Sequence, residues 1–115
     1  SPLTEYFTCQ SREANNRRLY VLFHPNRMEV FALDKGKLLL INSFNSKHTS
    51  DHIYYLLYVW QQLGYSQEKD QLFLTGEVES KDALLAELKR FLRQVEFLPT
   101  QPTLPFDIQS LMTCE

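Results

Sequence analysis

The spacing of the apolar residues changes once along this chain, and this change limits the folds open to it. From Leu19 to Phe44 the apolar residues form short runs rich in β-branched and aromatic side chains, which are typical of strands. After Phe44 they recur three and four residues apart, which is typical of amphipathic helices. The sequence therefore predicts strands first, followed by helices that pack on them.

Three strands are predicted in the first part of the chain, over residues 19–23, 28–33 and 38–44. Pro25 lacks an N–H for a strand ladder and favours a turn between the first two strands. Gly36 adopts positive φ without a Cβ clash, so Asp34 to Lys37 is expected to form a hairpin turn. Two tight turns predict an antiparallel meander.

Two helices and two further strands are predicted in the second part. The first helix is expected to begin at a cap formed by Thr49 or Ser50 and to end at Gly64. Its predicted buried face consists of Ile53, Leu56, Leu57 and Trp60. A strand over residues 72–74 follows, and then a helix capped by Ser80. The apolar stripe of that helix is expected to contain Leu84, Leu85, Leu88, Phe91, Leu92 and Val95. Residues 97–98 are the predicted fifth strand.

The resulting order, β-β-β-α-β-α-β, predicts one α/β domain with a mixed sheet. A length of 115 residues is typical of a single domain. Helices that join strands favour parallel crossovers, while the first three strands are antiparallel. We divide the chain into a polar lead-in over 1–18, a domain over 19–99 and a Pro-rich tail over 100–115.

Charge and composition argue against several classes of function. The formal net charge is -2, so no broad basic surface is expected for nucleic acid or an anionic membrane. No apolar run approaches the roughly 20 residues that span a bilayer. The two cysteines do not make a disulfide framework, and we expect reduced thiols in a cytoplasmic protein.

Several segments resemble a family of uncharacterised bacterial proteins with an actin-like ATPase fold. These segments are Val30-Phe31-Ala32-Leu33, Asp34-Lys35-Gly36-Lys37, Leu39-Leu40-Ile41-Asn42-Ser43-Phe44, Gln62-Leu63-Gly64 and Leu72-Phe73-Leu74-Thr75-Gly76-Glu77. The resemblance covers residues 19–99 and implies a ribonuclease-H-like half-domain. Family members are about twice as long, so the chain resembles their C-terminal half and lacks an N-terminal lobe.

The resemblance implies a nucleotide site between two such half-domains, but this sequence departs from it at two places. In working actin-like ATPases, the turn between the first two strands carries an aspartate and glycines. Here that turn is His24-Pro25-Asn26-Arg27. A paired glycine is expected after the fourth strand, yet Gly76 is followed by Glu77. The missing carboxylate removes a hard oxygen ligand for a metal ion. Glu77, in place of the second glycine, adds a Cβ where a ligand would need close approach to the backbone.

Ligand candidates nevertheless fall where the fold would approach a nucleotide. The loop from Asn42 to Ser50 leads into a helix N-terminus, whose free N–H groups can hold an anion, and Lys47 adds positive charge. The full set of ligand candidates is His24, Asn26, Arg27, Asn42, Lys47, Thr49, Ser50 and Gly76. An ordinary capped loop and ordinary surface turns explain the same residues.

No catalytic residue, metal site or cofactor is predicted. His48 and His52 are spaced i, i+4 around the helix start, which is compatible with shared metal ligation. No third ligand is evident, so we interpret both as solvated polar residues.

The most unusual segment is the tyrosine-rich helix from Tyr54 to Gln61. One face is enough to pack on a sheet, so Tyr54, Tyr55 and Tyr58 are candidate interface residues. Their cover is expected to be the tail, an N-terminal lobe or a second copy of the chain. The apolar residues of the tail are Leu104, Phe106, Ile108 and Leu111.

Two functions therefore remain open. The first is a non-catalytic interaction or scaffold module with a degenerate actin-like fold. The second is the nucleotide-binding half of an actin-like ATPase that needs an N-terminal lobe.

Overall fold

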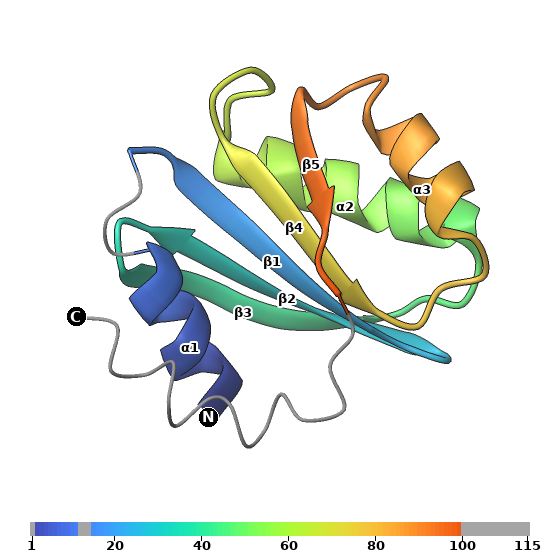
Figure 1. Cartoon of the computed structure of the whole chain (residues 1–115), viewed down its shortest axis with the longest axis horizontal. Coiled ribbons are helices and arrows are strands. Elements are labelled where there is room, and N and C mark those ends of the chain that lie inside the picture. Colours follow the sequence, from blue (N-terminus) through green and yellow to red (C-terminus); the bar gives the residue numbers. More distant parts are fainter. Residues whose placement is uncertain (1, 12–14, 100–115) are drawn as a thin grey trace.

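A five-stranded mixed sheet forms the centre of the molecule (Figure 1). The structure is a computed structural model that describes residues 2–11 and 15–99. The strand order is β3-β2-β1-β4-β5. In chain order the elements are α1 (Pro2–Ser11), β1 (Arg17–His24), β2 (Arg27–Asp34), β3 (Lys37–Asn45), α2 (Thr49–Leu63), β4 (Gln71–Gly76), α3 (Lys81–Leu88) and β5 (Gln94–Phe97).

The first three strands form the expected antiparallel meander. The residues that turn β2 into β3 are Lys35 and Gly36, with φ of 50° and 86°. Positive φ at both central residues is the hairpin conformation that matches the twist of the flanking strands. The register between β2 and β3 shifts between Ala32 and Leu33, just before this turn. The meander is thus set by local turn chemistry.

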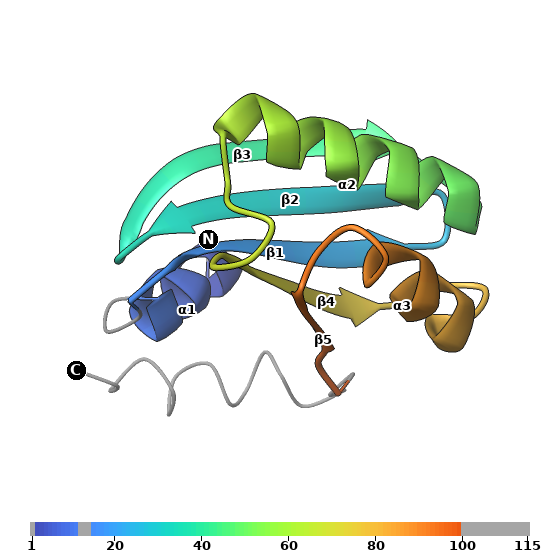
Figure 2. The ribbon, with the colours of Figure 1, turned by 90° about the horizontal axis from the view of Figure 1, so that it is seen from above.

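The two later strands join the sheet in parallel. The helix α2 carries the chain from β3 at one edge to β4, which pairs parallel with β1. The helix α3 then leads to β5, which pairs parallel with β4. Both helices lie on the same face of the sheet, as the view from above shows (Figure 2). This α/β arrangement is the fold predicted from the sequence.

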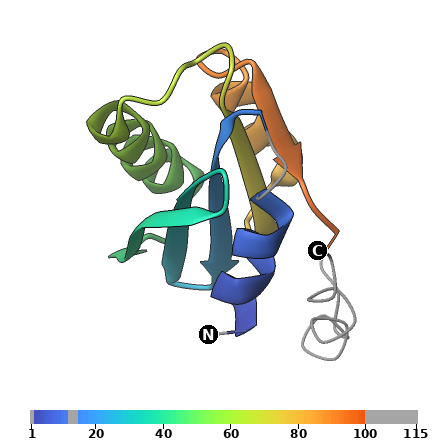
Figure 3. The same cartoon turned by 90° about the vertical axis from the view of Figure 1, so that its left-hand side faces the viewer.

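A third helix, α1, covers the other face of the sheet (Figure 3). The sequence analysis treated residues 1–18 as a polar lead-in and predicted neither α1 nor the start of β1 at Arg17. Phe7 is 2% exposed and stacks on Tyr20, with ring centroids 4.2 Å apart. The Ser11 hydroxyl accepts a hydrogen bond from the N–H of Gly36 at 2.9 Å. Leu3 and Tyr6 also pack against this cluster, so α1 docks through an apolar side of its own.

The predicted end of α2 is confirmed, whereas its predicted cap and its predicted buried face differ from those in the structure. Gly64 ends the helix in the left-handed conformation, with φ of 70°. The cap is His48 rather than Thr49 or Ser50. The buried residues of the helix are His52, Leu56, Val59 and Trp60, whereas Ile53 and Leu57 are half-buried. The buried stripe is therefore rotated from the predicted one.

The second predicted helix is shorter than its apolar stripe suggested. The helix α3 ends at Leu88, while Val95 belongs to β5. Leu92 is buried beyond the helix end, and Phe91 is 44% exposed. The apolar residues after Leu88 keep the three- and four-residue spacing of a helix. They nevertheless lie beyond the end of α3, in the segment that leads to β5 and in β5 itself.

Trp60 offers a direct test of this core. It is 3% exposed and packs edge-on against Tyr65, so Trp60→Ala should lower the free energy of unfolding by about 3–5 kcal/mol. Tyr58→Ala, on the exposed side of the same helix, should change it by less than about 0.5 kcal/mol. Urea unfolding of both variants provides the comparison. Equal midpoints for Trp60→Ala and the unmutated chain would show that Trp60 is outside the core.

Candidate functional site

Most of the predicted ligand residues lie at one end of the sheet, which we call the β1–β2 end. It comprises the turn at Pro25 and Asn26, the loop over residues 46–48 before α2, and the segment from Gly76 to Glu79. Phe23 pairs with Gly76, and Arg27 pairs with Asn45, so the ends of all these strands meet there. Asn42 is the exception, because it sits opposite Val30 within the strand ladder.

The N-terminus of α2, which was considered as an anion site, faces a carboxylate of the protein itself. Glu79 Oε1 accepts a hydrogen bond from the Thr49 N–H at 3.3 Å, and Glu79 Oε2 lies 3.2 Å from His48 Nδ1. The bond to His48, followed by that to the Thr49 N–H, lowers the pKa of Glu79. The positive end of the helix dipole is thereby neutralised internally.

The cations of the β1–β2 turn are also partnered. His24 Nε2 lies 2.8 Å from Glu29 Oε1, and Arg27 Nη1 lies 3.7 Å from Glu29 Oε2. Neither pair is buried, so each contributes little to stability. Their consequence is electrostatic, because a phosphate near this turn would meet the Glu29 carboxylate as well as the two cations.

Gly76 has a packing role that accounts for its presence. Its φ is 108°, and a Cβ built on it would lie 2.3 Å from the carbonyl oxygen of Phe23. The next N–H, of Glu77, donates to the same oxygen at 3.1 Å. A glycine is thus required for the close approach of β4 to β1, whether or not a ligand binds there.

His52 is buried, which overturns its interpretation as a solvated residue. It is 1% exposed, its Nδ1 lies 2.6 Å from Ser46 Oγ, and its ring lies 4.6 Å from that of Phe23. Burial lowers the pKa of His52, and this effect outweighs the nearby carboxylates of Asp51 and Glu79. His48, in contrast, is exposed and paired with Glu79, so the two histidines do not share one site.

A small cavity of about 210 Å³ remains at the β1–β2 end. It is lined by Pro25, Lys47, Glu77, Val78 and Glu79. Ligand pockets for molecules of nucleotide size usually measure roughly 300–1,000 Å³. Among the residues that the structure describes, no group of three potential metal-ligating side chains comes together.

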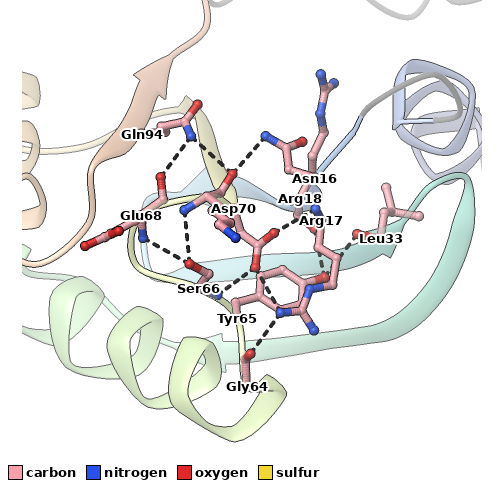
Figure 4. A network of polar contacts seen from close by, with 11 residues as sticks. Asn16, Arg17, Arg18, Leu33, Gly64, Tyr65, Ser66, Glu68, Asp70 and Gln94 are labelled. Atoms are coloured by element: carbon pink, nitrogen blue, oxygen red, sulfur yellow. Dashed lines mark hydrogen bonds and ion pairs between the residues drawn. The ribbon is translucent and has the colours of Figure 1, made fainter.

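The opposite end of the sheet holds a polar network around Asp70 (Figure 4). Asp70 Oδ1 accepts from the Arg17 N–H at 2.8 Å, and Oδ2 accepts from the Ser66 N–H at 2.6 Å and from Arg17 Nη2 at 3.1 Å. The Tyr65 hydroxyl donates to the carbonyl oxygens of Arg18 and Leu33 at 3.1 Å each. Burial raises the pKa of Tyr65, which keeps its hydroxyl protonated as a donor.

The candidate interface tyrosines are divided by the fold. Tyr54 is 66% exposed and Tyr58 is 50% exposed. Tyr55 is half-buried because its ring stacks on Phe44 of β3 at 4.8 Å. The tail that was expected to cover them lies outside the described residues. Leu98 packs on the other face of the sheet, against the cluster that contains Phe7 and Phe73.

Comparison with known families places the chain in one of them. The model of a family described as "Protein of unknown function (DUF3822)" matches residues 1–95. This chain belongs to the DUF3822 family. Among curated proteins, no relative matches the chain. The match begins at residue 1, so the family domain includes the segment that the sequence alone presented as a lead-in.

Two crystal structures show the fold of this DUF3822 member. A Bacteroides thetaiotaomicron protein, described as having an actin-like ATPase fold and unknown function, is 43% identical with a TM-score of 0.87. That match covers 99% of this chain and 44% of the other, so the chain spans less than half of the Bacteroides protein. The ethanolamine utilization protein EutJ from Carboxydothermus hydrogenoformans is 14% identical, with a TM-score of 0.53 and coverage of 96% and 52%. Its similarity supports the actin-like fold alone.

Three of the residues that organise the β1–β2 end were missed by sequence reasoning. Glu79 lies 30 residues from Thr49, and no local spacing signals that contact. In the sequence, Ser46 looked like an ordinary loop residue and His52 like an ordinary residue at a helix start. A serine six residues before a histidine, on either side of a helix cap, is a pattern that could have indicated this contact.

None of the helices in the described ranges is long and apolar enough to cross a membrane.

The packing role of Gly76 can be tested with a matched pair of variants. Gly64→Ala places a Cβ in open space and costs only the left-handed conformation, roughly 1–2 kcal/mol. Gly76→Ala adds a collision with the Phe23 backbone, so its loss of unfolding free energy should be larger by about 1–3 kcal/mol. Chemical denaturation without any nucleotide is the measurement. Equal losses in the two variants would contradict the packing role.

The buried His52 should make stability depend on pH. The pKa of His52 is lowered in the folded protein, so below about pH 6.5 the unfolded chain binds more protons than the folded one. Stability should therefore fall as pH drops from 6.5 toward the lowered pKa. Urea midpoints at pH 7.5 and 5.5 should differ more for the unmutated chain than for His52→Gln, with His48→Gln as the exposed control. The same pH loss in His52→Gln would rule out His52 as its source.

Proposed function

We propose that this chain is a non-catalytic interaction module with an actin-like fold. The observation that carries the proposal is the Glu79 carboxylate at the N-terminus of α2. An anionic phosphate would have to displace this carboxylate, or lie beside it, to use the helix dipole. Since the Thr49 N–H already donates to Glu79, a phosphate also gains less from that donor.

Two other features support the loss of nucleotide chemistry. Glu29 is shared by the two cations of the β1–β2 turn, and this turn contains no aspartate and no glycine. Gly76 serves the contact between strands, so its presence is no sign of a nucleotide loop. The β1–β2 end accordingly functions in our proposal as a structural cap on the sheet.

The proposed interaction surface is the exposed side of α2. Tyr54 and Tyr58 are large side chains with few rotatable bonds, of the type enriched in binding hot spots. The candidates for the partner are an N-terminal lobe of a longer protein and a second copy of the chain. We place the module in the cytoplasm, as a chain whose two cysteines make no disulfide framework.

The second candidate function is the nucleotide-binding half of an actin-like ATPase. It is favoured by the convergence of His24, Lys47 and Gly76 at one end of the sheet, beside the small cavity. It also draws on the length of the Bacteroides relative, of which 44% is matched. A further lobe could supply the rest of a nucleotide cleft.

Calorimetric titration with ATP and magnesium tests whether this chain by itself binds a nucleotide. We expect no binding at micromolar concentration, because the Glu79 carboxylate opposes the phosphate charge. Heat release with a micromolar Kd would overturn the proposal. Thermal unfolding gives a second readout, since a ligand at 100 times its Kd adds roughly 2.7 kcal/mol of stability.

The variant Glu79→Gln tests the proposed reason. Glutamine keeps an oxygen to accept from the Thr49 N–H but removes the charge. If the carboxylate is what excludes phosphate, this variant should bind inorganic phosphate or ATP more tightly than the unmutated chain does. Glu87→Gln, on an exposed face of α3, is the control for a general change in net charge.

A further inference from the structure

The strand β3 forms a long and exposed edge of the sheet. It contains nine residues and lies at the end of the order β3-β2-β1-β4-β5. Three of its apolar side chains are exposed: Leu38 by 37%, Leu39 by 42% and Ile41 by 50%. An edge strand presents peptide N–H and C=O groups that can pair with another strand. This edge therefore provides both backbone and apolar contacts for strand addition.

The antiparallel ladder indicates which peptide groups face outward. The two-residue turn closes with the pair His24 and Arg27, and peptide groups then alternate in direction along β2 and β3. By this alternation the β3 residues opposite Met28 and Val30 bond to β2, and the peptide groups of Ile41 and Ser43 face outward. Consistent with this, the Ser43 N–H donates to the side chain of Asn42 at 2.8 Å.

The edge strand after Lys37 and the adjoining part of α2 contain no charged residue. Residues 38–45 of β3 and residues 52–63 of α2 contain no Lys, Arg, Asp or Glu, although such residues make up 23% of the whole chain. Near a two-fold axis each residue meets its own copy, so any charge there would face a like charge. Two copies can therefore meet at these uncharged segments without repulsion between like charges. The ends of the sheet carry charged residues, which would face their own copies there.

The tyrosines of α2 add contact area on the face of the sheet opposite Ile41, which pairs with Phe31 on the α1 side. Tyr55 stacks on Phe44 of β3, which places this flank of the helix over the edge strand. Tyr58 is one turn further along the same flank, and Tyr54 contacts the ring of Tyr55 edge-on at 5.3 Å. A stable interface buries roughly 1,200–2,000 Å², more than one strand pair supplies. Tyr54 and Tyr58 supply the additional area.

We propose that β3 pairs in antiparallel fashion with β3 of a second copy of this chain, centred on Ile41. The pairing joins the two sheets edge to edge, and the two-fold axis brings the tyrosine flanks of both α2 helices to the same face. The inference rests on the proposed function as an interaction module and identifies its partner. The absence of Lys, Arg, Asp and Glu from residues 38–45 and 52–63 favours a second copy, because a two-fold axis places these segments near their own copies.

The test is the molar mass of the chain in solution, measured by light scattering and sedimentation over a range of concentrations. The unmutated chain should approach twice 13.6 kDa as concentration rises. Ile41→Lys and Ile41→Glu should each remain at the mass of one chain, because each places like charges opposite one another. An equal mixture of these two variants should restore the dimer through opposite charges.

Control variants keep the result specific to the edge strand. Phe91→Lys changes another exposed apolar residue, away from β3, and should leave the dimer intact. Far-UV circular dichroism verifies that each variant is folded. Should Ile41→Lys fail to fold, Ser43→Lys, at an exposed position of the same strand, replaces it.

Several outcomes would overturn the strand pairing. These are a chain that stays monomeric at every concentration, single Ile41 variants that remain dimeric, and a mixture that fails to restore the dimer. If Tyr58→Glu dissociates a dimer that Ile41→Lys leaves intact, the interaction module stands and the β3 pairing falls. Binding of ATP, measured separately, would refute the proposed function without bearing on the dimer.

Discussion

A buried carboxylate, Asp70, fixes the parallel pair on which the rest of the sheet is built. Asp70 is 4% exposed and precedes β4, while its partner Arg17 begins β1. An isolated buried carboxylate is costly, so Asp70 must lie where the N–H groups of Arg17 and Ser66 reach it. This requirement aligns the starts of β1 and β4. The antiparallel meander on one side and β5 on the other then follow from that central pair.

Both ends of the sheet use their polar groups internally. At the start of β1, Arg17 and Asp70 satisfy each other, and at the β1–β2 end Glu79 and Glu29 meet His48, His24 and Arg27. A phosphate-binding end would instead need donors that await a ligand. The sequence lacks the aspartate and the paired glycines of a nucleotide site, and charged groups at this end of the sheet pair with one another. At the β1–β2 end, His24 and Arg27 face Glu29, and His48 faces Glu79.

The parts of the fold that could be predicted are those determined by neighbours in the sequence. The hairpin at Gly36 and the helix end at Gly64 depend on a backbone conformation that glycine favours, and both were found as expected. The position of α1 could not be predicted, because it depends on the stacking of Phe7 on Tyr20 across the sheet. The same holds for the β1–β2 end, where Glu79 reaches Thr49 from 30 residues away. Residue types indicated where a site would lie but not which charges would meet there.

The two edges of the sheet differ in a way that composition alone does not reveal. The edge strand β5 has four residues, and Lys81 lies over the ring of Phe97 at 4.8 Å. Short length and nearby charge are the usual means by which proteins protect an edge from unwanted pairing. The edge strand β3 has nine residues, and after Lys37 it carries no charge or proline. An edge without such protection would promote aggregation unless a defined partner covers it. In the proposed two-fold pairing, each β3 covers the other, and the two outer edges of the joined sheet are the protected β5 strands.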